Sequence, residues 1–273
     1  MDVLSNIKKR KSWRTYKKEP LSDEIIHKIK KDLVKTHIGP LQNQVHVYFF
    51  SKETTEDQKL GTYGMIKNAH YFLGGEIIPA KQAFLDFGYV LEKAVLCLTD
   101  LDLGTCWLGG TFKRSKFMDA ADIDDNKTMP AVIATGYPKS KKSLWDKLVS
   151  FNAGSQKRKP WKELFFDEKL NPLDKDALGD YGDLLEMVRI APSASNLQPW
   201  RIIKHNDRYH FYLKRKKLYQ KIIKNVDLQM IDMGIAMYHF AGSASQLGLS
   251  GDWQVQEVEI DKNWEYVISW IAE

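Results

Sequence analysis

Hydrophobic residues recur at helical spacing in two long stretches, and these stretches predict the two central helices of the fold. Over residues 81–98 apolar side chains occupy nearly every face of the predicted helix, and a second apolar helix is expected at about residues 230–245. A helix that is apolar on all sides is buried in the core. Shorter helices are predicted over residues 22–34, with Ser22 as a candidate N-cap, and over residues 181–189.

Strands are predicted where apolar and polar residues alternate, or where a short apolar run ends at turn residues. The predicted strands cover residues 45–50, residues 71–73 (which Gly74 and Gly75 are expected to end), residues 129–137, and a hairpin over residues 201–213 that turns at Asn206-Asp207. Each central helix is therefore expected to be flanked by strands.

Composition excludes several classes of protein. The 273 residues have a formal charge of +6, but 41 basic residues are interleaved with 35 acidic ones, which favours a solvated surface over a nucleic-acid site. No run of about 18 apolar residues predicts a membrane span, and no apolar segment follows the basic start as in a signal peptide. Cys97 and Cys106 match no metal-binding spacing and are expected to be buried thiols in a reducing cytoplasm.

The second half of the chain repeats features of the first. A shift of 146 positions, without a gap, aligns identical residues at five places: Asp86 with Asp232, Gly88 with Gly234, Leu101 with Leu247, Leu103 with Leu249, and Trp107 with Trp253. These pairs share a helix-then-turn context, which indicates an internal duplication. Two halves are therefore predicted, residues 1–160 and 161–273, with a polar and basic crossover over residues 139–160.

The first half carries a motif that suits an oxyanion. Arg10, Ser12 and Arg14 alternate with other residues, so an extended segment would place all three on one side. Two guanidiniums and a hydroxyl in that arrangement favour phosphate, because charge-assisted bonds to phosphate are strong. A basic N-terminal tail is the alternative, but Trp13 and Tyr16 are costly to expose and favour an ordered segment.

The second half carries the loop APSASNLQPW at residues 191–200. Its prolines and its serine and asparagine side chains predict a stiff loop that can hydrogen-bond the edge of a flat polar ring and pack against its face. Its first-half counterpart, GPLQNQVHV, keeps Pro40 and Asn43 but lacks the serines and the tryptophan. Gly109 and Gly110 would let a backbone approach a neighbour, although a simple turn explains that pair taken alone. Together the halves hold one complete set of polar groups.

These motifs resemble those of the flavin-dependent nitroreductase family. The resemblance rests on Arg-x-Ser-x-Arg, the PSxxNxQPW loop, a GLGTxWxGG-like turn after the central helix and the basic segment before Lys159-Pro160, and it covers nearly all of residues 5–260. Ordinary members are homodimers with FMN at each of two subunit interfaces. Here the arginine motif and the loop lie about 180 residues apart, which implies a fused variant with one FMN per chain. Its fold would be α+β, a pseudo-dimer of two half-domains whose central helices pack against mainly antiparallel sheets.

Carried over residue by residue, the resemblance implies a phosphate site built largely by the first half. Arg10 and Ser12 would hold the FMN phosphate, with Lys11 contributing its backbone. Arg14 would reach either the phosphate or the N1/C2-carbonyl side of the flavin ring, where a positive charge stabilises the anionic reduced flavin. Arg158 would be an additional phosphate ligand.

The resemblance also implies contacts to the rest of the flavin. Gly109 and Gly110 would lie near flavin N5, where a backbone N–H could bond the atom that receives hydride. The ring or the ribityl chain would be bordered by Pro192, Ser193, Ala194, Ser195 and Asn196, with Gln198 as a weaker candidate. No catalytic acid or base and no metal ligand is expected, because the flavin carries the chemistry.

The function implied is that of an FMN-dependent oxidoreductase, with reduced nicotinamide, NAD(P)H, as electron donor and a nitroaromatic or quinone as acceptor. The chain would act as a cytoplasmic monomer without nucleic-acid or membrane partners. No G-x-G-x-x-G follows a predicted strand. Two alternatives stay open: a flavin-binding or regulatory module without turnover, and nucleic-acid binding through the basic clusters, which would weaken steeply with salt.

Overall fold

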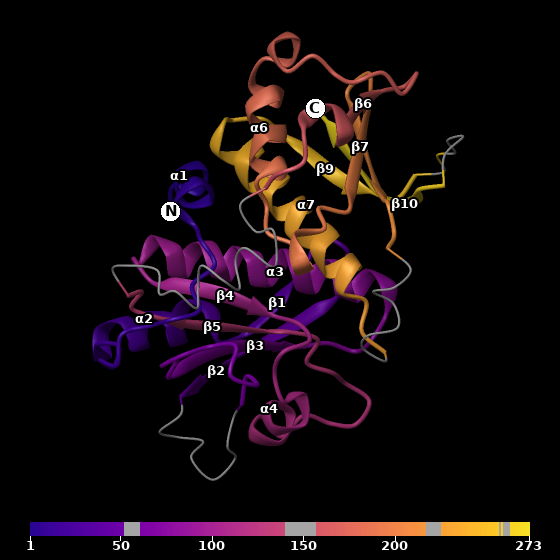
Figure 1. Cartoon of the computed structure of the whole chain (residues 1–273). Coiled ribbons are helices and arrows are strands. Elements are labelled where there is room, and N and C mark those ends of the chain that lie inside the picture. Colours follow the sequence, from indigo (N-terminus) through magenta and orange to yellow (C-terminus); the bar gives the residue numbers. More distant parts are fainter. Residues whose placement is uncertain (52–60, 140–156, 217–224, 257, 259–262) are drawn as a thin grey trace.

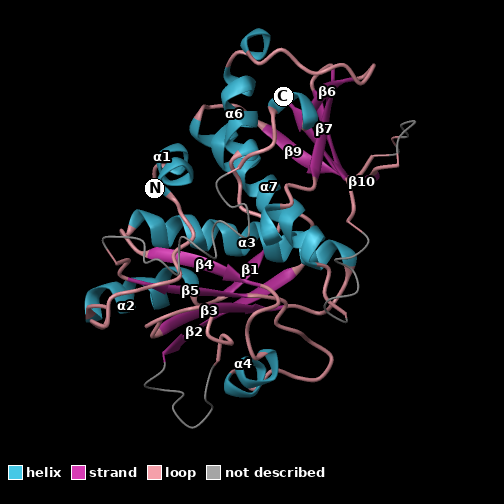
Figure 2. Cartoon of the chain, viewed as in Figure 1, coloured by secondary structure: helices cyan, strands magenta, loops and turns pink. Residues whose placement is uncertain are grey.

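In the described part of the chain, two five-stranded sheets form the two halves of the molecule, and Figures 1 and 2 show them in separate parts of the view. The structure is a computed structural model, and it describes residues 1–51, 61–139, 157–216, 225–256, 258 and 263–273. The first sheet contains, in spatial order, β1 (Thr36–Ile38), β2 (Gln44–Ser51), β3 (Tyr71–Glu76), β5 (Val132–Gly136) and β4 (Gly104–Leu108). The second contains β6 (Phe165–Asp167), β7 (Trp200–His205), β8 (Arg208–Leu213), β10 (Glu265–Ala272) and β9 (Gly251–Gln254).

The two sheets therefore have the same strand order, and they differ at one edge. In the first sheet every neighbouring pair is antiparallel, including β1 with β2. In the second sheet β6 runs parallel to β7, and the other pairs are antiparallel. The α+β prediction with mainly antiparallel sheets is confirmed.

The helices follow the predicted periodicity closely. The predicted helices at residues 22–34, 81–98, 181–189 and 230–245 are α2 (Asp23–Leu33), α3 (Lys81–Asp100), α6 (Asp180–Arg189) and α7 (Leu228–Gln246). The Ser22 side chain accepts a hydrogen bond from the Ile25 backbone N–H at 3.4 Å, which makes it the N-cap of α2 as predicted. Further short elements are α1 (Val3–Lys9), α4 (Arg114–Ala120), η2 (Trp161–Glu163), η3 (Asp176–Leu178) and η4 (Ala194–Asn196).

The central helices α3 and α7 cross where two of the duplicated glycines lie. A Cβ on Gly88 would lie 2.2 Å from the carbonyl oxygen of Ile231, and a Cβ on Gly234 would lie 1.9 Å from that of Leu85. Leu85 and Ile231 are separated by the same 146 positions as the two glycines. The crossing therefore has approximate twofold symmetry, and glycine is required because the two helix backbones are in contact.

Several sequence predictions need correction. Gly74 and Gly75 do not end the strand at residues 71–73 but lie within β3, where both pair with β2. A Cβ there would meet the side chains of Met129 at 2.5 Å and Phe87 at 2.9 Å, which favours glycine at these positions. The helix α1, which is only seven residues long, was not predicted from the sequence. The residues of β4 were assigned to a turn instead of a strand. The strand predicted over residues 129–137 is present as the shorter β5, which covers Val132–Gly136.

Both cysteines are free, but only Cys106 is buried, since Cys97 is partly exposed on α3. None of the helices in the described parts of the chain is long and apolar enough to cross a membrane. Most of the predicted crossover, residues 140–156, lies outside the described residues, so the boundary between residues 160 and 161 stays a prediction.

Candidate functional site

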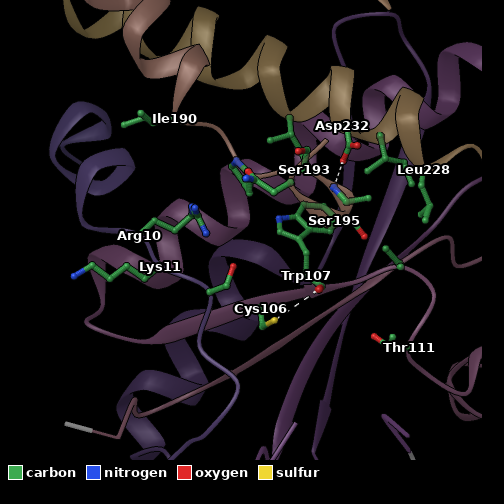
Figure 3. A pocket seen from close by; sticks show the side chains of 18 of the residues that line it. Arg10, Lys11, Cys106, Trp107, Thr111, Ile190, Ser193, Ser195, Leu228 and Asp232 are labelled. Atoms are coloured by element: carbon green, nitrogen blue, oxygen red, sulfur yellow. Dashed lines mark hydrogen bonds between the residues drawn. The ribbon is translucent and has the colours of Figure 1, made fainter. Parts of the chain in front are cut away.

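A cavity of about 830 Å³ lies where segments from both halves meet (Figure 3). It brings together twelve of the thirteen predicted site residues: Arg10, Lys11, Ser12, Arg14, Gly109, Gly110, Arg158, Pro192, Ser193, Ala194, Ser195 and Asn196. Figure 3 shows Arg10 and Lys11 at one end, Leu228 toward the other, and Trp107 between them. Segments far apart in the sequence therefore share one cavity wall.

The arginine motif reaches the cavity because its segment runs along β4. Arg10 forms the C-cap of α1 with φ −57° and ψ 128°, which is where the chain becomes extended. Ser12 then forms a parallel bridge with Thr105, and the Trp13 backbone N–H donates to the Thr105 carbonyl at 2.9 Å. The predicted extended segment is therefore present.

Arg10 places a nearly buried positive charge at this end of the cavity. Its side chain is 6% exposed, and its Nε makes no hydrogen bond with the described residues. Its nearest acidic partner is Glu92, whose Oε1 lies 3.9 Å from that Nε. Burial lowers the pKa of Arg10, and the charge of Glu92 opposes that shift. A buried guanidinium with an unpaired N–H favours an anionic ligand.

Arg158 adds a second guanidinium to the same end. Its Nη2 donates to the Ile190 carbonyl at 2.9 Å and its Nη1 donates to the side-chain oxygen of Asn196. Burial, followed by the charges of Arg10 and Arg189, lowers the pKa of Arg158 to about 10. Two arginines that disfavour each other's charge gain stability when an anion binds between them.

The loop after α6 faces these arginines. Its Ala194 backbone N–H donates to Oδ1 of Asp232 at 2.8 Å, and the Ser193 hydroxyl accepts from the Gln198 backbone N–H at 2.9 Å. Ser195 and Asn196 have φ of 46° and 55°, in the left-handed region, within the short 3-10 turn η4. Because these φ values are not those of a right-handed helix, the segment is a tight turn within the predicted loop.

Gln198 is the predicted residue that does not line the cavity. Its side chain is buried, donates to the carbonyls of Lys157 (3.3 Å) and Asn196 (3.0 Å), and accepts from the Lys159 backbone N–H at 2.7 Å. It ties the loop to the basic segment that carries Arg158. Its place in the structure is that of a support for the loop.

The glycine pair lines the cavity from the first half, and Gly109 packs against the second half. A Cβ on Gly109 would lie 2.7 Å from a methyl carbon of Leu228, which belongs to α7. The Gly109 carbonyl accepts from Nη2 of Arg114 at 3.1 Å. The Leu228 side chain therefore packs closely against the Gly109 backbone and would have to move to admit a Cβ there.

Sequence reasoning missed the residues that complete the wall. These are Ile7, Lys8, Cys106, Trp107, Thr111, Ala131, Ile190, Leu228, Ile231, Asp232 and Ile235. Trp107 and Asp232 each belong to a duplicated pair, so the repeat itself was a usable signal for them. The sequence pattern predicted the aliphatic residues of α7 only as members of the hydrophobic core. No group of three or more metal-ligating side chains is present among the described residues.

The chain is similar to known proteins over nearly its whole length. A family model described as "Putative TM nitroreductase" matches residues 2–244. A solved structure from Thermotoga maritima with a matching description is 19% identical, with a TM-score of 0.65, and the match covers 99% of this chain and 94% of that one. That likeness extends the shared fold over both halves. No curated protein sequence matches the chain.

Two shorter solved structures also match. A nitroreductase family protein from Clostridium novyi NT is 21% identical with a TM-score of 0.42, over 54% of this chain and 91% of that one. An FMN-dependent nitroreductase from Clostridium difficile R20291 is 19% identical with a TM-score of 0.41, over 54% of this chain and 94% of that one.

Proposed function

Because the chain belongs to the nitroreductase family, we propose that it is an FMN-dependent oxidoreductase. It would take hydride from NAD(P)H and pass it through FMN to a nitroaromatic, a quinone or a similar electron-poor acceptor. The observation that carries this proposal is the meeting of the Arg10 segment and the 192–196 loop at one cavity, although about 180 residues separate them in the sequence.

The residues of the cavity fit FMN at both of its ends. The buried Arg10 side chain, whose Nε has no hydrogen-bond partner among the described residues, and the neighbouring Arg158 suit a phosphate. At the loop, the backbone and side chains of residues 192–196 supply donors and acceptors for the edge of a polar ring. A cavity of about 830 Å³ lies within the range of ordinary cofactor and ligand pockets.

Each part of the wall would have a distinct task. Arg10 and Arg158 would bind the phosphate, and Arg14 would place positive charge near it or near the flavin ring. Ile231 and Ile235 of α7 would exclude water from the ring, since both are buried and apolar. When bound, the flavin would supply the hydride transfer, and the backbone at Gly109 would border its reacting edge.

A single chain would provide the whole site. The first half supplies the Arg10 segment and the second half the loop, so the fused chain would act as a monomeric pseudo-dimer with one FMN. The two free thiols agree with the predicted reducing cytoplasm.

The test is a binding titration of FMN against the purified wild type and the double variant Arg10→Ala/Arg14→Ala. Charged hydrogen bonds contribute about 1.5–3 kcal/mol each, so the double variant should weaken binding more than about a hundredfold. Lys28→Ala is the matched control, because Lys28 forms an exposed ion pair with Asp32 on α2. Its Kd should be unchanged.

Wild-type protein that stays colourless and takes up no FMN would refute the proposal. If the protein binds FMN, rapid-mixing absorbance with NADH and with NADPH tests whether the FMN-loaded protein turns over. Bleaching of the flavin by either nucleotide supports the oxidoreductase, whereas a flavin that neither one reduces supports a binding module.

A further inference from the structure

A buried acid and a buried histidine join the two central helices directly behind Arg10. Glu92 on α3 and His239 on α7 are both 0% exposed, and Nε2 of His239 lies 3.0 Å from Oε1 of Glu92. The other ring nitrogen, Nδ1, lies 2.9 Å from the Met187 carbonyl oxygen. Oε2 of Glu92 accepts a hydrogen bond from the indole N–H of Trp107 at 2.8 Å. The pair therefore touches one cavity residue directly.

The hydrogen-bond pattern requires this pair to hold a proton. Nδ1 of His239 faces a carbonyl, so it must carry hydrogen, and Nε2 faces a carboxylate oxygen. That second contact is a hydrogen bond only if Nε2 also carries hydrogen or if Glu92 is protonated. In both arrangements one extra proton is shared, and the pair has no net charge.

The shared proton matters because Glu92 is also the acid nearest Arg10. Oε1 of Glu92, the oxygen that faces His239, lies 3.9 Å from Nε of Arg10. With a neutral pair, the charges of Arg10 and Arg158 stay available to an anion in the cavity. Without the proton, Glu92 would cancel one of them. Among the described residues, Cys106 of β4 also acts electrostatically on Arg10, and Glu92 acts on Tyr238 of α7.

The duplication shows that this acid–base pair occurs at only one of the two repeat-related places on α3 and α7. The position that repeats Glu92 is Tyr238, and the position that His239 repeats is the exposed Lys93. Trp253, the repeat of Trp107, is left with a buried indole N–H that has no hydrogen-bond partner among the described residues. The chain thus has an acid and a base at one of two equivalent places, the one beside Arg10.

We propose that Glu92 and His239 are positioning residues that set the charge of the phosphate end of the cavity and orient Trp107. This inference rests on the proposed FMN site. The shared proton keeps the buried carboxylate from neutralising Arg10, so the site presents both arginine charges to the phosphate.

Three variants separate this role from simple packing. His239→Gln keeps an N–H donor near Glu92 but cannot carry the proton, so it leaves a net negative charge beside Arg10. Glu92→Gln removes the charge and can donate to a neutral His239 while accepting from Trp107. The double variant Glu92→Gln/His239→Gln is again neutral.

The experiment is a fluorescence titration of each folded variant with FMN and with riboflavin, which lacks the phosphate. His239→Gln should weaken FMN binding by about tenfold, the effect of one unit charge at about 10 Å with an effective dielectric constant near 20. Riboflavin binding should stay the same. Glu92→Gln and the double variant should bind FMN within about threefold of wild type, so the second substitution rescues the first.

The outcomes that overturn the inference are distinct from those that overturn the proposed function. Equal losses for FMN and riboflavin, no loss in His239→Gln, or a folded double variant that fails to recover would each overturn the inference alone. Thermal unfolding by circular dichroism identifies the folded variants. Wild-type protein that binds neither flavin overturns the proposed function and this inference with it.

Discussion

The two halves have the same strand order and the same aspartate on the central helix, but the two aspartates hold their loops differently. Asp86 accepts hydrogen bonds from the backbone N–H groups of Leu41 (3.0 Å) and Asn43 (2.9 Å) and from the Asn43 side chain (2.8 Å). Asp232 accepts one from the Ala194 N–H at 2.8 Å, and its Oδ2 makes no hydrogen bond with the described residues. The first loop is therefore fastened more completely to its helix.

The asparagine of each loop has different hydrogen-bond partners. Asn43 donates to its own aspartate, whereas Asn196 accepts from Arg158 and donates to the Lys157 carbonyl at 2.7 Å. The two halves share a scaffold, but in one of them the asparagine holds a cationic side chain at the cavity. A duplicated fold can thus keep its packing while only one copy of this loop lines the cavity.

The largest expected effect tests the symmetry of the helix crossing. Gly234→Ala would place a Cβ 1.9 Å from the Leu85 carbonyl oxygen, which is backbone and cannot rotate away. The two central helices would have to separate, and we expect a loss of about 3 kcal/mol or more in the free energy of unfolding. Urea unfolding followed by circular dichroism measures it.

The same helix offers a matched control. At Gly242 the nearest atoms to an added Cβ are side-chain carbons of Val3 at 3.3 Å and Tyr238 at 3.4 Å. Gly242→Ala should be close to neutral, or stabilising by up to about 1 kcal/mol from helix propensity. Equal losses for Gly234→Ala and Gly242→Ala would contradict a specific backbone contact at the crossing.

The next comparison exchanges each aspartate for asparagine. In Asp86→Asn an amide N–H₂ would replace an oxygen that accepts two hydrogen bonds from Asn43, so donors would face donors. We expect a loss of about 1–3 kcal/mol in stability. Asp232→Asn keeps the acceptor for Ala194 and replaces an oxygen without a partner, so near neutral pH it should cost less. The reverse order, measured by urea unfolding, would contradict the difference between the loops.

Asp232 also predicts a pH dependence that its replacement should remove. Burial raises the pKa of Asp232 well above its usual range. The folded protein therefore binds a proton that the unfolded chain releases near pH 4, and this contribution to stability is lost as pH rises toward the folded value. Relative to wild type, Asp232→Asn should gain up to about 1.4 kcal/mol per pH unit from about pH 4 upward. A constant difference between the two proteins at all pH values would contradict this.

The smallest effect concerns the centres of the two sheets. Leu73 lies opposite Ile133 in the first, whereas His210 lies opposite Ser269 in the second, with its Nδ1 2.6 Å from the serine hydroxyl. Burial, then the charges of His205 and Arg208, lowers the pKa of His210 to about 4.

Protonation of that histidine then favours the unfolded chain in acid. Between about pH 6.5 and pH 4 the unfolded chain binds the proton and the folded protein does not, so stability falls with falling pH. His210→Leu should flatten this slope by at most about 1 kcal/mol per pH unit, measured by urea unfolding at each pH. A slope equal to that of wild type would show that His210 titrates alike in both states.

Much of the fold could be predicted from local pattern. Apolar periodicity identified α3 and α7 within a few residues of their ends, and the Asn206-Asp207 turn identified the hairpin of β7 and β8. The prediction failed where a contact with a distant segment decided the structure. Gly74 and Gly75 are typical of a strand end in the sequence, but pairing with β2 keeps them in the strand, and Met129 and Phe87 pack where their Cβ atoms would lie.

The sequence by itself determined the two central helices, the repeat that relates them, and the candidate residues for binding the phosphate and the ring of FMN. Those features depend on side-chain types at short spacing, which local periodicity and turn chemistry reveal. Only the tertiary structure decided that residues 10–14 and 192–196 face one cavity, that Asp232 lines it, and that Glu92 meets His239 behind Arg10. These contacts exist because α3 and α7 cross backbone to backbone, and that close approach joins positions far apart in the chain.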